Sequence, residues 1–179
     1  SRLRGNDKCL EISPEKDVQM GERKGIIERP ADMRGYFGMG VESISKSGNL
    51  GNLLRSSHAF GASFFFTVTS NVDFRELNSS DTSHATDHLP YYNFASVDAV
   101  QLPKGCKLVG VELMDGAVNL PKFHHPLAAA YVLGPELGSL SPDMVKRCDY
   151  IVKIPTRFCV NVGIAGALVM YDRVLRYGK

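Results

Sequence analysis

The stretch SKSGNLGNLLRSSHAFGASFFFTV, residues 45–68, places two amides and one guanidinium where a strand-to-helix turn is expected. Asn49 and Asn52 stand among small residues, and Arg55 follows Asn52 by three positions. A guanidinium stays protonated near neutral pH, which makes it a poor general base, but its planar fork binds phosphate through two parallel hydrogen bonds. The amides therefore either cap a helix or belong, with Arg55, to a site.

Two later segments also combine small residues with one or two polar groups. LGPELGSLSPDM (133–144) carries Glu136 between two glycines, and IPTRFCVNVGIAGA (154–167) carries Asn161. Small residues let the backbone approach a ligand, which the polar groups would orient. Capping and chain turning explain any one of these loops alone, whereas three such loops at strand ends favour a binding site.

The elements around these loops predict one α/β domain. Strands are expected at 35–44, 63–69, 107–114, 128–134 and 150–155, helices at 50–60 and 160–178, and a short helix followed by a loop at 88–103. The strand segments are continuously apolar, which favours a mostly parallel sheet covered by helices on both faces. Ligands bind beyond the carboxyl ends of such strands, where the three loops would meet.

Composition excludes several other classes of protein. The 179 residues suffice for one domain with a substantial core, and a net charge of +2 gives no large basic footprint, although a local basic patch is compatible with it. No apolar run approaches the roughly 20 residues that span a bilayer, and no signal peptide is apparent. The cysteines form no CxxC pair, so we expect neither zinc nor disulfides but reduced thiols in a cytoplasmic protein: Cys9, Cys106, Cys148 and Cys159.

Residues 1–33 differ from the rest of the chain. They are rich in charge and poor in large apolar residues, which predicts a flexible or extended arm before a domain at 34–179. The basic residues in and beside this arm either follow an RNA backbone or are simply solvated: Arg23, Lys24, Arg29 and Arg34.

The order GNLGNLLRSSHAFG, YVLGPELGSLS and IPTRFCVNVGIAGALVMYD resembles the three motifs of the SPOUT class, specifically TrmH-like (SpoU) RNA 2′-O-methyltransferases. The resemblance covers about residues 34–175. It implies an α/β fold with a C-terminal deep trefoil knot, an exception to the rule against knots. It further implies S-adenosyl-L-methionine bound in that knot, an RNA substrate (tRNA or rRNA), and a homodimer whose active site is completed across the interface.

The resemblance also assigns residues to roles. Asn49, Arg55, Glu136 and Asn161 fall on family positions of the active site, and Gly61 falls on a first-motif glycine. An apolar slot for the adenine and backbone contacts to the cofactor would come from seven residues, for whose apolar members core packing is the alternative: Val111, Leu113, Leu133, Gly134, Ile154, Cys159 and Val160.

One departure from the family pattern concerns the third motif. Cys159 replaces the family's serine, and the loop from Pro155 to Asn161 is shorter than in many relatives. A catalytically weak RNA-binding or scaffold relative is therefore the alternative to a methyltransferase, although the four active-site residues favour the enzyme. Arg55 would hold a phosphate beside the target ribose or, as is proposed for the family, help deprotonate the hydroxyl; the first role suits a guanidinium better. Glu136 would orient Arg55 or form a surface ion pair.

The remaining candidates have plainer interpretations. His84 and His88 are four apart, but Pro90 follows and no HExxH pattern is present, so no metal site is expected. His124 and His125 are expected in a solvated loop. Tyr91 and Tyr92 would either stack a base or cover the sheet. The small residues of the last helix would pack it closely against the knot or at a dimer interface.

Overall fold

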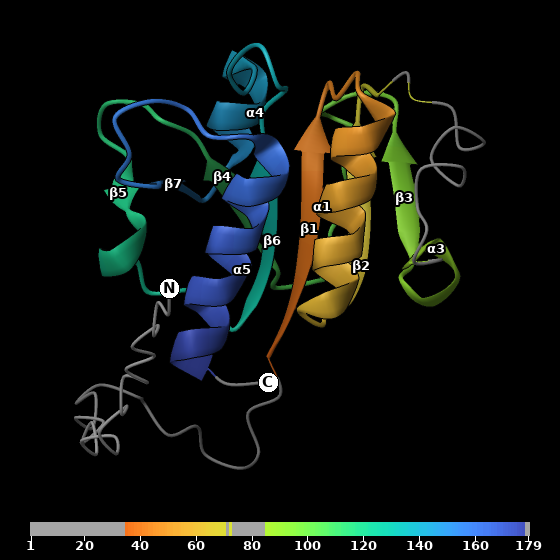
Figure 1. Cartoon of the computed structure of the whole chain (residues 1–179), viewed down its shortest axis with the longest axis horizontal. Helices are drawn as coiled ribbons and strands as arrows, with labels where there is room; N and C mark the ends of the chain where they lie inside the picture. Colours follow the sequence, from red (N-terminus) through yellow and green to blue (C-terminus); the bar gives the residue numbers. More distant parts are fainter. Residues whose placement is uncertain (1–34, 71, 73–84, 178–179) are drawn as a thin grey trace, which may run out of the picture.

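A seven-stranded sheet with the order β3-β2-β1-β6-β4-β7-β5 organises the computed structural model, which describes residues 35–70, 72 and 85–177 (Figure 1). Every pair of neighbouring strands is parallel. The strands are Tyr36–Glu42 (β1), Phe64–Val68 (β2), Tyr91–Phe94 (β3), Lys107–Val111 (β4), Val118–Asn119 (β5), Ala128–Leu133 (β6) and Tyr150–Lys153 (β7). The predicted parallel α/β fold is confirmed. The trefoil knot stays a prediction, and the N-terminal arm with its basic residues, like His84, lies outside the described residues.

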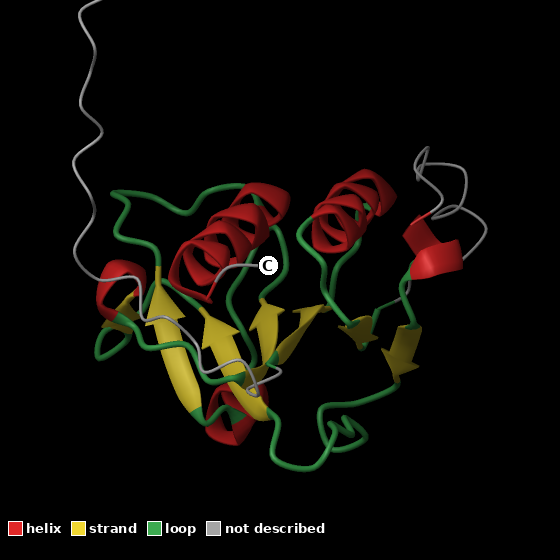
Figure 2. Ribbon diagram, turned by 90° about the horizontal axis from the view of Figure 1, so that it is seen from below, coloured by secondary structure: helices red, strands yellow, loops and turns green. Residues whose placement is uncertain are grey.

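Helices cover both faces of the sheet, but unequally. The long helices α1 (Ser47–Ala59) and α5 (Val162–Tyr177) lie side by side on one face, with the short α3 (Ala85–His88) beyond α1 (Figure 2). The opposite face is covered by α4 (Pro142–Arg147) and the irregular segment 95–106 (Figure 2). Arg147 fixes that segment by donating hydrogen bonds to the carbonyls of Val97 and Val100. A 3-10 turn, η1 (Leu120–Lys122), follows β5.

Strand β1 shows how the sequence assigns side chains to the two faces. Phe37, Met39 and Val41 are buried in the cluster beneath α1 and α5. The alternate positions are glycines: a Cβ on Gly38 would lie 2.2 Å from the ring of Phe64, and one on Gly40 would lie 2.4 Å from the ring of Phe66. The glycines therefore make room for the aromatic rings of β2 on the second face, as the two-residue period of a strand requires.

The structure corrects two predicted elements. Helix α1 begins at Ser47 after the N-cap residue Lys46, so Asn49 and Asn52 lie inside the helix, and the interpretation of either as its N-cap is wrong. In segment 88–103 the expected short helix is likewise wrong, because α3 ends at His88 and strand β3 follows. The β3 backbone pairs with β2 at the edge of the sheet, and this tertiary pairing overrides local sequence preference.

Strand β3 separates the two tyrosines whose roles were left open. Tyr91 stacks on Phe65 with ring centroids 6.1 Å apart, and its hydroxyl lies 2.7 Å from that of Thr67, so Tyr91 covers the sheet. Tyr92 points to the other face and is 51% exposed. Base stacking by Tyr92 stays a prediction.

The prediction that His125 lies in a solvated loop is wrong, although His124 is exposed. His125 is buried, with Nδ1 2.6 Å from the hydroxyl of Tyr131 and Nε2 2.9 Å from Oδ2 of Asp172. The neighbouring Arg173 is also buried and donates to the carbonyls of residues 36, 126 and 127 and to the hydroxyl of Tyr131. This polar cluster fastens the C-terminal half of α5 to β1 and β6.

We expect the free energy of unfolding to fall on mild acidification because of His125. Burial lowers the pKa of His125 to about 4 against the opposing effect of Asp172, whereas an unfolded histidine has a pKa of about 6.5. Between these values the unfolded chain binds more protons, so stability rises with pH across this window and is lost as pH falls. The loss from pH 7 to pH 5 should be about 2 kcal/mol.

Urea unfolding at pH 7, 6 and 5 measures this effect. The variant His125→Gln, which does not titrate, should show a smaller decrease over the same range. Equal decreases in the two proteins would show that another group is responsible.

Candidate active site

A cavity open to solvent lies beyond the carboxyl ends of β4, β6 and β7, where the predicted loops meet. It holds about 600 Å³ of empty space when the part open to solvent at its mouth is included. All seven residues predicted to bind the cofactor line it. The full lining is Val111, Glu112, Leu113, Leu133, Gly134, Pro135, Glu136, Gly138, Ile154, Cys159, Val160, Val162 and Ala165.

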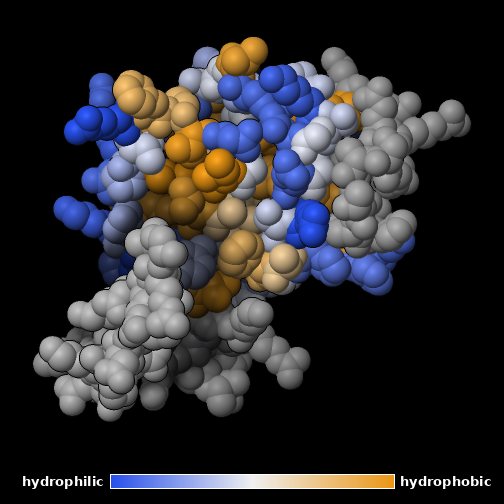
Figure 3. All heavy atoms as spheres, viewed as in Figure 1, coloured by the Kyte–Doolittle hydropathy of each residue, from blue (hydrophilic) through white to orange (hydrophobic). Residues whose placement is uncertain are grey.

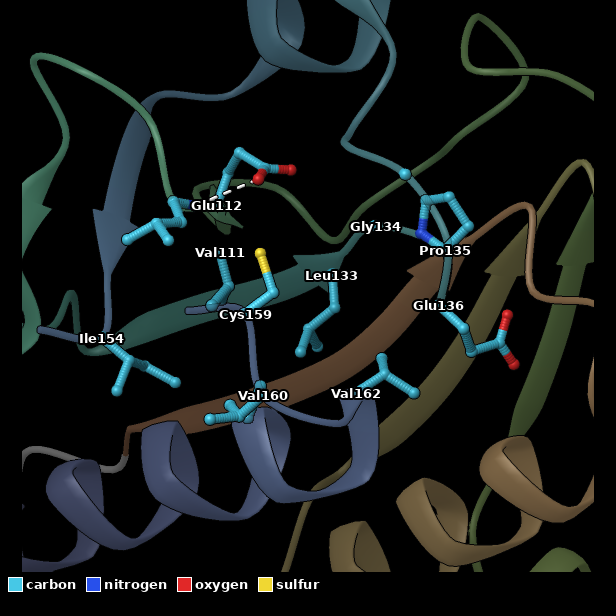
Figure 4. A pocket seen from close by; sticks show the side chains of 13 residues that line it. Val111, Glu112, Leu133, Gly134, Pro135, Glu136, Ile154, Cys159, Val160 and Val162 are labelled. Atoms are coloured by element: carbon cyan, nitrogen blue, oxygen red, sulfur yellow. Dashed lines mark hydrogen bonds between the residues drawn. The ribbon is translucent and has the colours of Figure 1, made fainter. Parts of the chain in front are cut away.

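The cavity has an apolar end and a polar end. Figure 4 shows Ile154 and Val160 at one end, Leu133 in the middle, and Pro135 and Glu136 at the other. The thiol of Cys159 points between Val111 and Leu133 (Figure 4). Aliphatic walls of this kind suit a flat aromatic group, while the polar end offers hydrogen-bonding partners.

A chain of hydrogen bonds joins the three predicted loops. Nδ2 of Asn161 donates to Oδ1 of Asn49 at 3.1 Å, and Nδ2 of Asn49 donates to Oε1 of Glu136 at 3.1 Å. Asn161 directly precedes α5, and its Oδ1 accepts the N–H of Gly163 at 2.9 Å, as a helix-capping asparagine does. Three of the four predicted active-site residues are thus brought together.

Glu136 is a fixed hydrogen-bond acceptor at this junction. Besides Asn49, its carboxylate accepts the backbone N–H groups of Ser45 at 3.5 Å and Lys46 at 3.2 Å. Burial raises the pKa of Glu136, but the hydrogen bonds from its own backbone, Asn49, Ser45 and Lys46 outweigh burial and hold the pKa below its usual value. A carboxylate with a lowered pKa is a weak base, so this geometry suits anchoring better than proton abstraction.

Arg55 stands apart from that network. It lies on the exposed side of α1, in the middle of the helix rather than at its start, while Leu50, Leu53 and Leu54 form the buried side. Among the described residues no hydrogen bond or ion pair involves Arg55, so within one chain Glu136 does not orient it.

The other first-motif residues have structural roles of different kinds. Asn52 is exposed, and its backbone carbonyl accepts the hydroxyl of Ser56 at 2.8 Å. Gly61 follows α1 with φ +78, a left-handed conformation that favours glycine at the end of a helix.

Sequence reasoning missed two carboxylates that hold the loop 134–141. Glu42, at the end of β1, accepts the N–H of Ser141 at 2.8 Å and its hydroxyl at 2.6 Å. Glu112, directly after β4, accepts the N–H of Leu140 at 2.8 Å and the N–H of Leu113 at 3.0 Å. The sequence signal that could have identified them is an acidic residue at the end of two apolar strand segments. Both segments end in the tripeptide GVE, at 40–42 and at 110–112.

Gly134 is required by the close approach of this loop to β6. A Cβ on Gly134 would lie 2.9 Å from the backbone nitrogen of Leu140 and 3.0 Å from the carbonyl carbon of Ser139. The loop could not keep its position beside any larger residue.

A second cavity lies at the edge of the sheet, on the face that carries α4. It is lined by Ser63, Phe64, Pro90, Tyr92, Phe94, Gln101, Leu102 and Pro103.

Over the described ranges, none of the helices combines the length and the hydropathy that a membrane span requires. In the same ranges, no group of three or more His, Cys, Asp or Glu residues could hold a metal ion.

Comparison with known proteins agrees with this geometry. The signature of the SpoU rRNA Methylase family matches residues 38–171. A tRNA (guanosine(18)-2′-O)-methyltransferase of Borreliella burgdorferi is 27% identical over 88% of this chain and 75% of its own length. An uncharacterized tRNA/rRNA methyltransferase of Archaeoglobus fulgidus is 27% identical over 95% of this chain and 76% of its own length.

Solved structures share the fold. The SpoU methyltransferase AviRb of Streptomyces viridochromogenes, in complex with the cofactor AdoMet, superposes with a TM-score of 0.69 at 22% identity and covers 79% of this chain. An rRNA methyltransferase of Sinorhizobium meliloti gives a TM-score of 0.70 at 19% identity and covers 80% of this chain. This chain spans 58% of the length of each of these two proteins.

Proposed function

Because the chain belongs to the SpoU rRNA Methylase family, we propose that it transfers a methyl group from S-adenosyl-L-methionine to a ribose 2′-hydroxyl of tRNA or rRNA. The observation that carries this proposal is the cavity, where the family's second and third motifs form most of the walls and Glu136 joins them to Asn49 of the first. The Borreliella burgdorferi relative, a tRNA 2′-O-methyltransferase by name, supports the ribose hydroxyl as acceptor.

The chemistry of the cavity lining suits the adenosyl group of this cofactor. The aliphatic end of the cavity, formed by Val111, Ile154 and Val160, accepts a flat adenine, and Gly134 lets the loop 134–141 close over the end of β6 beside it. The carboxylates of Glu112 and Glu136 suit a cationic ligand. When bound, S-adenosyl-L-methionine would supply the methyl group on a positively charged sulfur: the ribose oxygen would bond to the methyl carbon as the carbon–sulfur bond breaks, with S-adenosylhomocysteine as the leaving group and the hydroxyl proton released to solvent.

The residues around the cavity act mainly by positioning. Asn49, Glu136 and Asn161 hold three loops in one arrangement through the hydrogen bonds described above. Arg55 binds a phosphate beside the target ribose, since its planar fork matches phosphate oxygens. Orientation of two reactants can supply roughly 7 to 11 kcal/mol of barrier reduction, so a strong base is not required for a large rate enhancement.

Isothermal titration with S-adenosyl-L-methionine and S-adenosylhomocysteine tests the cofactor, and labelled methyl transfer to RNA from cells lacking the gene tests the reaction. Nucleotide-resolution maps of ribose methylation in cells with and without the gene then identify the position. Binding followed by a single missing 2′-O-methyl mark supports the proposal. Absence of cofactor binding would favour the scaffold alternative.

We also propose a homodimer, in agreement with the resemblance. The buried side of α5 faces α1 and the sheet, whereas four large apolar residues form an exposed stripe along the helix: Ile164, Leu168, Tyr171 and Leu175. Figure 3 shows the hydrophobic surface gathered over α5. The spacing of four, three and four residues keeps the stripe on one side of the helix, and such a contiguous apolar surface is typical of a protein interface.

A charge in the middle of this stripe should separate the subunits. We expect the wild-type protein to sediment as a dimer at micromolar concentration, and Leu168→Asp to sediment as a monomer, because the charge would be buried without a partner. Lys146→Glu, exposed on α4 on the other face, is the control and should remain dimeric. A wild-type species near 19.6 kDa would contradict the proposal.

A further inference from the structure

We propose that Glu112 binds the ribose hydroxyls of the adenosyl group and thereby selects a ribonucleoside cofactor. This inference rests on the proposed function. It concerns a residue outside the three motifs, directly after β4, whose half-buried side chain lines the cavity.

The carboxylate of Glu112 is held in place and has unused acceptor capacity. Oε2 accepts the N–H of Leu140 at 2.8 Å, and Oε1 accepts the N–H of Leu113 at 3.0 Å. An ionised carboxylate offers about four lone-pair positions, two on each oxygen. Each oxygen of Glu112 can therefore accept one more donor while both backbone bonds stay in place.

The position of Glu112 along the cavity matches the ribose rather than the base. Figure 4 shows its carboxylate between the apolar end at Ile154 and the polar end at Glu136. With the adenine at the apolar end and the reacting sulfur toward the hydrogen-bonded network, the ribose that joins them lies in the middle. A Cβ on Gly134 would be 3.5 Å from Oε2 of Glu112, so this carboxylate lies beside the backbone at the end of β6, in the middle of the cavity wall.

The chemistry of a ribose suits this acceptor. Its neighbouring 2′ and 3′ hydroxyls are two donors on one face of the ring, and a carboxylate that accepts both makes charge-assisted hydrogen bonds. An acidic residue performs the same task for the ribose 2′-hydroxyl in dinucleotide-binding folds. The alternative is that Glu112 only attracts the positive charge of the cofactor, or only holds the loop.

Glu42 provides a matched control. It also ends a strand and also holds the loop 134–141 through two hydrogen bonds, both to Ser141. It is only 3% exposed and is not part of the cavity lining. Glu42→Gln therefore weakens the same loop without changing a group that could contact the ligand.

The test is calorimetric titration of S-adenosylhomocysteine and its 2′-deoxy and 3′-deoxy analogues into the wild-type protein, Glu112→Gln and Glu42→Gln. The wild type should bind the deoxy analogues about ten- to hundredfold more weakly, the range expected for losing a hydrogen bond to a charged group. The quantity to compare is the ratio of the Kd of each deoxy analogue to the Kd of S-adenosylhomocysteine. In Glu112→Gln this ratio should fall several-fold. In Glu42→Gln all affinities should weaken together and the ratio should stay as in the wild type.

The ratio of affinities separates the roles. Glu112→Gln with an unchanged ratio, whether or not its absolute affinities fall, would overturn the proposal, because loop support and general charge attraction act equally on all three ligands. No binding of S-adenosylhomocysteine by the wild type would instead overturn the proposed function together with this inference.

Discussion

Replacing Arg55 by lysine should reduce methyl transfer nearly as severely as replacing it by alanine, by at least about a hundredfold, because both changes remove the planar fork that positions the substrate. Lysine keeps the charge but cannot bind a phosphate in a bidentate way. Arg55 is exposed and, among the described residues, forms no hydrogen bond or ion pair. Cofactor affinity and thermal midpoint should therefore remain close to those of the wild type.

Single-turnover methylation, calorimetric cofactor affinity and thermal unfolding of both variants provide the measurement. Lys146→Ala, which removes an exposed cation from α4, is the control and should retain full activity. A lysine variant with wild-type turnover would show that Arg55 acts only as a point charge. Loss of folding or of cofactor binding would show that Arg55 is structural.

Gly134→Ala should severely weaken cofactor binding. The added Cβ would meet the backbone of Leu140 and Ser139 at 2.9 and 3.0 Å, and backbone atoms yield only if the loop moves. Movement of the loop would break the hydrogen bond from Leu140 to Glu112. We expect affinity to fall by roughly a hundredfold or more, and the free energy of unfolding to fall by about 1–3 kcal/mol from overpacking.

Calorimetric titration and urea unfolding measure these two effects. Gly48→Ala is the control, because a Cβ on Gly48, in the first turn of α1, meets nothing within 4 Å. It should bind the cofactor as the wild type does. Wild-type affinity in Gly134→Ala would mean that the loop 134–141 tolerates displacement and does not define the cavity.

The sequence predicts well that the three loops come together at one edge of the sheet, and the reason is geometric. Continuous apolar strands indicate a parallel sheet, and the carboxyl ends of parallel strands meet at one edge. Loops at 45–55, 133–144 and 154–161 are then brought together without knowledge of their conformations. For this reason all seven residues expected at the cofactor surround a single cavity, while their binding of a cofactor stays a prediction.

The partners within the site are less predictable, because they depend on contacts between distant residues. Asn49 lies inside α1 and bonds Glu136, 87 positions away, which no local capping pattern reveals. His125 looks like a loop histidine in sequence, yet Asp172, 47 positions away, gives it a buried partner. The roles of Glu42 and Glu112 likewise depend on a loop that folds back over the ends of two strands.

The pairing of β1 with β6 also determines when the chain can fold during its synthesis. Tyr36 lies opposite Ala128 in the sheet, and Arg173, 137 positions after Tyr36, donates to its carbonyl. A ribosome adds about 5–20 residues per second. It therefore needs roughly 5 to 18 seconds to extend the chain by the 92 positions from Tyr36 to Ala128. Throughout that time one edge of an apolar strand has no partner and is exposed to chaperones or to aggregation. Yield in the cell therefore depends on how the nascent chain is protected before β6 and α5 emerge.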